Sequence, residues 1–253
     1  MSAVYASFKV KASFEGNVGL PYWNTLGYVE YRTRAWPMAT TVPVVIGEGD
    51  GRGPARVNVA QATALDLTVH KTQSRAKPDV PVVNVSGSAS GTVNAIAGDV
   101  AVGGDDPTQT GTVTTLNANE NATVTTGPGT TVTTCNQYGA VLTSYGALTT
   151  LNSKSGTTTL YANPTTITAD GGTVYGRFTG TVATVTLRKG GDETPRLDFS
   201  LDPRARTVTN HSVTGGAVLN DPDGTVTFSN GGTWDRLSLK QSDLGPRFTL
   251  LRT

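Results

Sequence analysis

The chain has 253 residues, of which 15% are charged, and its formal net charge is +1. Such a neutral chain has no overall electrostatic attraction to nucleic acid or to an acidic membrane surface, so neither is an expected partner. Val and Thr recur between turn-forming Gly and Pro, without the apolar spacing of an amphipathic helix. The sequence therefore predicts an all-β fold.

Residues 1–78 are predicted to form a small antiparallel β-sandwich or barrel. Apolar and polar side chains alternate over residues 4–14, as in a half-buried strand. Two further strands, 42–46 and 56–59, are separated by the loop GEGDGRGP, which predicts a hairpin. That loop has neither the G-x-G-x-x-G spacing nor the G-K-[ST] ending of a phosphate-binding loop, so we expect it to be only a turn.

The same N-terminal segment carries a cluster of aromatic and basic residues. Exposed Tyr and Trp can stack on sugar rings or anchor a protein interface, whereas buried ones would fill the core of the β domain, and the sequence leaves both alternatives open. The candidate contact residues for a partner or a glycan are Tyr22, Trp23, Tyr31, Arg32, Arg34 and Trp36.

A near-repeat dominates residues 82–189, which follow a polar linker. VTTLN at Val113–Asn117 returns as VTTCN at Val132–Asn136 and as LTTLN at Leu148–Asn152, with starts 19 and 16 residues apart. Weaker echoes begin at Ile167 and Val185. Repeats of about this length are single units that bury their apolar side only against neighbouring copies, so the segment is predicted to be a repetitive β stack.

Two architectures fit this repeat spacing. A β-solenoid would place Asn117, Asn136 and Asn152 at equivalent corners, where their side chains could hydrogen-bond along the axis. An antiparallel sandwich also has turns at similar intervals, but the VTT[LC]N repeat favours the solenoid. In either case we expect Leu148 and Cys135 to be core residues. A second apolar set is predicted at Val124, Val141 and Leu160.

Residues 190–253 are predicted to form a C-terminal β cap that covers the end of the stack. Charge density rises at Gly190. Residues 225–229 and 233–239 flank an Asn-Gly turn, which is typical of a hairpin.

The sequence predicts no catalytic, cofactor or metal site. Only two His are present, and Asp221-x-Asp223-Gly lacks the distal Glu of a calcium loop. The best candidate acid and base pair is Asp198 with Asp202, which would lie on one face of an extended strand, about 13 Å apart. That separation is long for a glycosidase, and we expect the two carboxylates to pair with Arg196 and Arg204 instead.

The VTTLN, VTTCN and LTTLN repeats, between a small β domain and a cap, give the chain a resemblance to bacteriophage virion structural proteins. The start MSAVYASFKVKASFEG has no apolar segment of a secretory signal, which fits a chain made in a host cytoplasm and used on a virion. The resemblance implies a homotrimer that decorates a capsid as a cement protein or belongs to a tail fibre. Its partners would then be its own copies and the major capsid or tail proteins, with a host surface glycan as a further candidate.

Two other classes of protein stay open. A carbohydrate-binding or glycan-depolymerising tail-spike protein would need an aromatic groove or a carboxylate pair on the stack. A polymerising scaffold similar to bactofilins would have an uncapped stack with disordered ends.

Overall fold

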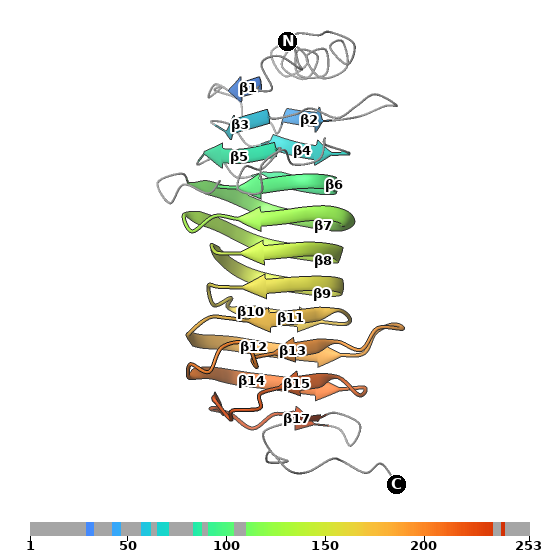
Figure 1. Ribbon diagram of the computed structural model, residues 1–253, viewed down its shortest axis with the longest axis vertical. Coiled ribbons are helices and arrows are strands. Elements are labelled where there is room, and N and C mark those ends of the chain that lie inside the picture. Colours follow the sequence, from blue (N-terminus) through green and yellow to red (C-terminus); the bar gives the residue numbers. More distant parts are fainter. Residues whose placement is uncertain are drawn as a thin grey trace.

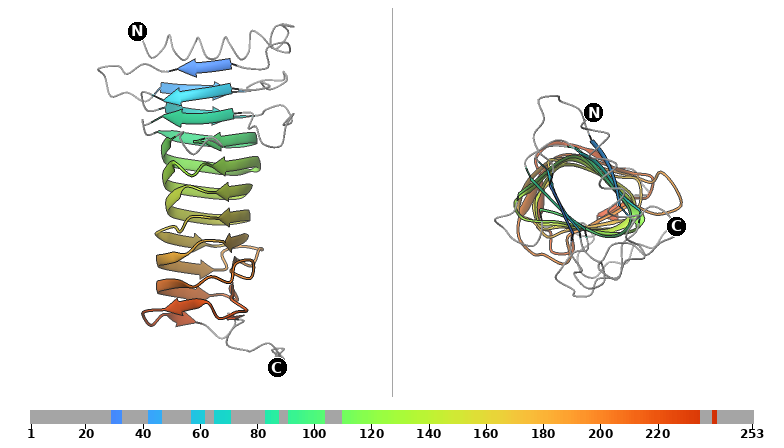
Figure 2. Two further views of the ribbon diagram at one scale, coloured as in Figure 1. Left: turned by 60° about the vertical axis from the view of Figure 1, so that its left-hand side comes forward. Right: turned by 90° about the horizontal axis from the view of Figure 1, so that it is seen from above.

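The computed structural model describes residues 29–32, 42–46, 57–61, 65–70, 83–87, 91–103, 110–234 and 239–240. Every regular element among them is a β-strand, and the strands lie one above another in chain order (Figure 1). Viewed along the long axis, successive turns superpose (Figure 2). The fold is a parallel β-solenoid, which confirms the first of the two architectures and makes the sandwich wrong for the repeat region.

The strands of the N-terminal half are β1 (Val29–Arg32), β2 (Val42–Ile46), β3 (Val57–Gln61), β4 (Leu65–Val69), β5 (Val83–Gly87), β6 (Thr92–Val102), β7 (Gly111–Thr126), β8 (Thr130–Ser144) and β9 (Ala147–Leu160). Those of the C-terminal half are β10 (Thr166–Ala169), β11 (Thr173–Gly176), β12 (Gly180–Arg188), β13 (Arg196–Asp198), β14 (Arg206–Thr214), β15 (Val218–Asn220), β16 (Val226–Phe228), β17 (Thr233–Trp234) and β18 (Leu239–Lys240).

Each turn pairs in parallel with the turns before and after it. Leu116 pairs with Cys135, and Cys135 with Leu151. Ile167 continues this column opposite Leu151. The echo at Ile167 therefore aligns with the fourth position of the repeat, and not with the first as the sequence spacing suggested. β7, β8 and β9 each bend at one edge, so one long strand lies on more than one side of the solenoid (Figure 1).

The core is one continuous apolar column along the axis. Leu148 is 2% exposed and Cys135 is fully buried, which confirms both predictions. Burial raises the pKa of the Cys135 thiol to about 12, so the side chain acts as a small apolar residue. Val141, by contrast, is 53% exposed, and its predicted core role is wrong. The neighbouring Leu142 pairs with Val124 and takes the inward position.

A ladder of asparagine amides runs along the outside of the solenoid. Asn117 Nδ2 donates to Asn94 Oδ1 (2.7 Å), Asn136 Nδ2 to Asn117 Oδ1 (2.9 Å) and Asn152 Nδ2 to Asn136 Oδ1 (2.9 Å). Asn94 Nδ2 extends the ladder to the hydroxyl of Thr68 at 3.3 Å. The predicted stacking is confirmed. The predicted corner position is wrong, because these residues lie within strands β6 to β9 and point away from the core.

The described strands of the N-terminal segment also belong to the stack. β2 pairs with β4, and β3 pairs with both β1 and β5, all in parallel. The predicted hairpin between 42–46 and 56–59 is therefore wrong, since β2 and β3 are not partners. A separate antiparallel domain over residues 1–78 is not confirmed, and the predicted strand over residues 4–14 lies outside the described residues.

The start of the predicted C-terminal cap likewise continues the solenoid. β13 pairs with β11 and β15, and β14 pairs with β12, so the rise in charge at Gly190 does not mark a change of fold. β16 and β17 both pair in parallel with β14. The predicted Asn-Gly hairpin is wrong, because its two strands form part of one more turn. A cap over residues 190–253 is not confirmed.

Candidate functional site

Of the predicted aromatic and basic contact residues of the N-terminal segment, two lie in a described strand. Tyr31 and Arg32 lie in β1, opposite Val59 and Ala60 of β3, and the structure describes only their backbone. Tyr22, Trp23, Arg34 and Trp36 lie outside the described residues. Their role as a contact for a partner or a glycan stays a prediction.

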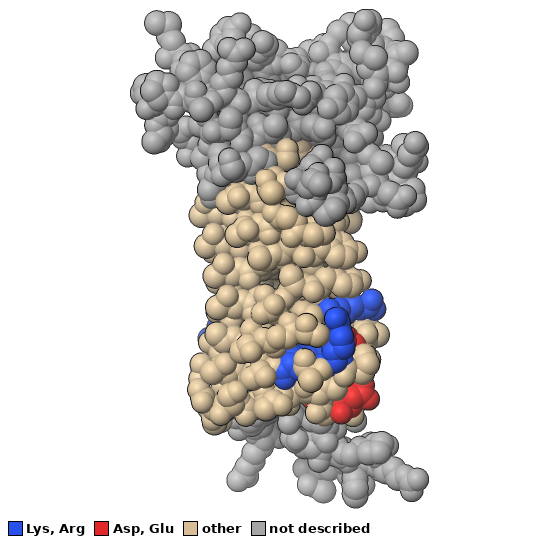
Figure 3. Space-filling model, turned by 90° about the vertical axis from the view of Figure 1, so that its left-hand side faces the viewer, with Lys and Arg blue, Asp and Glu red and all other residues tan. Residues whose placement is uncertain are grey.

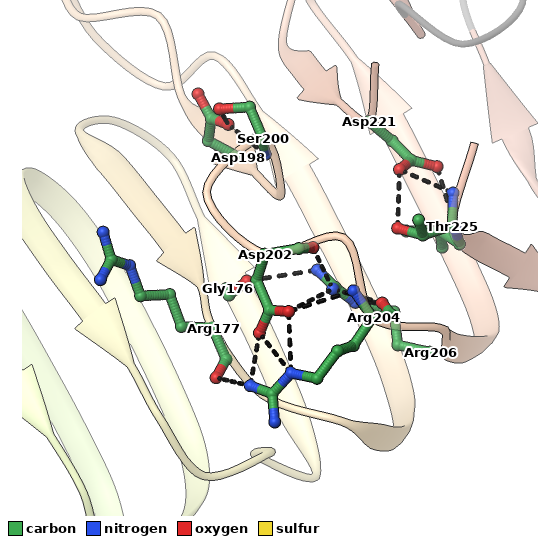
Figure 4. A network of polar contacts seen from close by, with 10 residues as sticks. Gly176, Arg177, Asp198, Ser200, Asp202, Arg204, Arg206, Asp221 and Thr225 are labelled. Atoms are coloured by element: carbon green, nitrogen blue, oxygen red, sulfur yellow. Dashed lines mark hydrogen bonds and ion pairs between the residues drawn. The ribbon is translucent and has the colours of Figure 1, made fainter. Parts of the chain in front are cut away.

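The densest polar cluster among the described residues surrounds Asp202, in the loop between β13 and β14 (Figure 4). Arg204 Nε donates to Asp202 Oδ1 at 2.8 Å, and Arg204 Nη2 donates to Asp202 Oδ2 at 2.5 Å. These charge-assisted bonds lower the pKa of Asp202 to about 2. The carboxylate therefore stays ionised at neutral pH and cannot serve there as a proton donor.

Two arginines connect this loop to the preceding turn. Arg204 Nη2 donates to the carbonyl of Arg177 at 2.9 Å. Arg206 is only 3% exposed, and it donates to the carbonyls of Gly176 (3.2 Å) and Asp202 (2.6 Å). Its guanidinium carbon lies 4.5 Å from the ring centroid of Phe199, a cation–π contact. The cluster thus holds a long loop against the solenoid wall.

Asp198 has its own set of donors, separate from those of Asp202 (Figure 4). It accepts hydrogen bonds from Ser200 Oγ (2.6 Å), Asn220 Nδ2 (2.9 Å) and Arg196 Nε (2.7 Å). Burial acts to raise the pKa of Asp198, but these donors outweigh it and the pKa is lowered. The predicted pairing with arginines is confirmed for both carboxylates. The premise of one extended strand is wrong, because β13 ends at Asp198.

Two other described carboxylates of this region, Asp221 and Asp170, have structural roles. Asp221 accepts hydrogen bonds from the backbone amides of Thr225 (2.9 Å) and Val226 (3.0 Å), the turn function typical of Asp. Asp170 pairs with Lys154 and Arg188 from neighbouring turns. In the part of the chain that the structure describes, no group of three or more His, Cys, Asp or Glu is placed to hold a metal ion. Asp105 and Asp106 lie outside that part.

A second candidate site is the outer surface of the solenoid wall. Residues 121–153 contain no Asp, Glu, Lys or Arg. In Figure 3 the charged atoms gather in the lower part of the view, and the described surface above them shows none. An uncharged wall of this length is unusual for a protein surface. A set of aligned, part-exposed residues on β6 to β10 and β12 runs through this segment and beyond both of its ends. We name this set the Thr/Asn face; it is formed by Thr92, Asn94, Thr115, Asn117, Thr134, Asn136, Thr150, Asn152, Thr166, Thr168, Thr184 and Thr186.

One surface feature was not predicted from the sequence. The rings of Tyr145 and Tyr161 stack with centroids 4.5 Å apart, and both side chains are exposed. Arg177 extends the column from the next turn, with its guanidinium carbon 5.8 Å from the Tyr161 centroid. The signal was present in the spacing, because the two tyrosines are 16 residues apart, as are Val132 and Leu148. Each ring covers one face of the other, which leaves less ring face for a sugar to stack on.

Comparison with known proteins adds no relative: no family model, no curated protein and no solved structure matches the chain. Within the described residues, no helix is long and apolar enough to cross a membrane.

Proposed function

We propose that the protein is a non-enzymatic structural component of a bacteriophage virion, a rigid rod that works as a homotrimer in a capsid-decoration or tail-associated position. The observation that supports this most is the unbroken parallel stack from β6 to β15, with a continuous apolar core. Its middle part, residues 121–153, carries no charged side chain. A rigid rod of this kind transmits force along its axis and holds its two ends at a fixed distance. Its exposed strand faces suit the side-by-side packing of protomers.

The state of the carboxylates favours a structural role over catalysis. A general acid needs a pKa raised toward the working pH, with a base nearby whose pKa differs. Here both Asp198 and Asp202 have lowered pKa values and are saturated by donors. Their bonds hold loops in place, which is what a durable rod requires.

Electron microscopy of the purified protein tests the proposed class. We expect short particles of uniform length in which rods lie side by side in threes. Open filaments would instead favour a polymerising scaffold similar to bactofilins.

A glycan assay tests the absence of catalysis. Bacterial surface polysaccharides are incubated with the protein, and their chain length is followed by size-exclusion chromatography. We expect no shortening. Depolymerisation that Asp198→Asn abolishes would overturn the proposal, and Thr159→Ser, a conservative change on the outer wall, serves as the control.

A further inference from the structure

The Thr/Asn face is a two-dimensional array of small polar groups. Thr92, Thr115, Thr134, Thr150, Thr166 and Thr184 pair in register and form one column. A second column, two residues along each strand, contains Asn94, Asn117, Asn136, Asn152, Thr168 and Thr186. Neighbouring rows are about 4.8 Å apart, and the two columns about 7 Å apart, because these are the strand spacing and the rise over two residues.

The groups of this array are held in fixed orientations. Thr is branched at Cβ and has few rotamers in a strand, so each turn presents its hydroxyl and methyl in a similar way. The asparagine amides are fixed by their own ladder, with bonds of 2.7–2.9 Å. Each amide has two N–H donors, and the ladder bond uses one of them. No Asp, Glu, Lys or Arg belongs to the face.

The spacing of this array can be compared with the lattice of crystalline water. Oxygen atoms in hexagonal ice repeat along one lattice direction with nearly the period of strands in a sheet. Along the perpendicular direction they repeat with a period close to two residues of a strand. Water held by regularly spaced hydroxyls and amides, and caged by the methyl groups between them, would therefore already have ice-like positions. Ordering each such water costs at most about 2 kcal/mol, and a rigid array lowers that cost.

We propose that the Thr/Asn face binds ice through an ordered layer of water. This inference goes beyond the proposed structural role and does not depend on it. The site is bounded near its lower rows by the Lys154–Asp170–Arg188 cluster, which lies two residues beyond the second column. The central rows, on β7, β8 and β9, are the expected centre of contact.

Partition into a slowly growing ice crystal tests the proposal, with the fraction of protein in the ice compared with that of an inert protein such as serum albumin. We expect the full chain to be enriched in the ice. Thr150→Lys, which places a long charged side chain in the middle of the face, should lower the enrichment to the albumin level. The matched control is Thr159→Lys, which changes a threonine of the same strand β9 that points outward on another side of the solenoid and is likewise part-exposed. It should retain the enrichment.

A second variant and a fold check keep the test decisive. Thr134→Lys makes the same change on β8, and circular dichroism shows which variants keep the strand signal. Absence of enrichment in the unmodified protein overturns the proposal, whatever the oligomeric state that sedimentation gives for it. Equal loss in Thr150→Lys and Thr159→Lys, with both folded, would also overturn it. The electron-microscopy result for the rod is unaffected by any of these outcomes.

Discussion

Leu148 provides a direct test of the register of the stack. Its side chain is 2% exposed and its backbone pairs with that of Val132, so it lies in the axial core between two turns. Leu148→Asp removes the buried side chain and puts a carboxylate into a site without a charged partner among the core residues. We expect this change to destabilise the repeat region strongly.

The magnitude follows from two contributions. Replacing a buried leucine by a small residue typically costs about 3–4 kcal/mol in free energy of unfolding, because transfer energy is lost and a cavity remains. An unpaired polar or charged group in an apolar site adds at least ~1–3 kcal/mol. The total, roughly 5 kcal/mol, is comparable with the whole stability of many domains. At ~2–4 °C per kcal/mol for a chain of this size, Tm should fall by more than ~10 °C.

Thermal unfolding followed by circular dichroism measures this change, and Val141→Asp is the matched control. Val141 is an apolar residue on the adjacent strand β8 but is 53% exposed. Substitutions at such positions usually change the free energy of unfolding by less than ~0.5 kcal/mol. Equal melting temperatures for the two variants, or a larger loss for Val141→Asp, would refute the register.

Three further predictions concern other parts of the solenoid. Asn136→Ala removes two ladder bonds and should cost about 1–2 kcal/mol, whereas Asn152→Ala removes one and should cost about half as much; equal urea midpoints for the two variants would count against the ladder. Because the folded pKa of Asp202 is about 2 and its ordinary value is 3.8, its contribution to stability is complete above about pH 4 and is lost as the pH falls toward about 2. The stability of Asp202→Asn should consequently vary less than that of the unmodified chain across this window, and parallel profiles would contradict the assignment. Cys135, buried and with its pKa raised to about 12, should react with a thiol reagent only after unfolding, so rapid labelling of the native protein would show that the core is open.

The repeat could be predicted from sequence because its inward positions are chemically distinct. Leu116, Cys135 and Leu151 are apolar between polar neighbours, and the identical Asn that follows each of them points to stacking. For the second apolar set, the sequence did not show in the same way which residue of an adjacent apolar pair faces the core. Val141 and Leu142 are both apolar, and only the pairing of Leu142 with Val124 decides which side chain is inside.

Strand direction was the other feature that sequence patterns left undetermined. Alternating apolar residues around a Gly-rich loop are compatible with a hairpin, but equally with a solenoid corner that leads to the next turn. The sequence pattern of β2 and β3 does not indicate a pairing partner one full turn away. In the structure β2 pairs with β4, and β3 pairs with β5. The tyrosine column was missed for a related reason, since two aromatic residues 16 positions apart become neighbours only when the length of the turn is known.

Sedimentation equilibrium of the purified protein tests the proposed assembly most directly. A rod that works as a homotrimer should sediment at three times the chain mass of 26.2 kDa, and its mass should not fall on dilution through the micromolar range. A single monodisperse species of 26.2 kDa at micromolar concentration would contradict it.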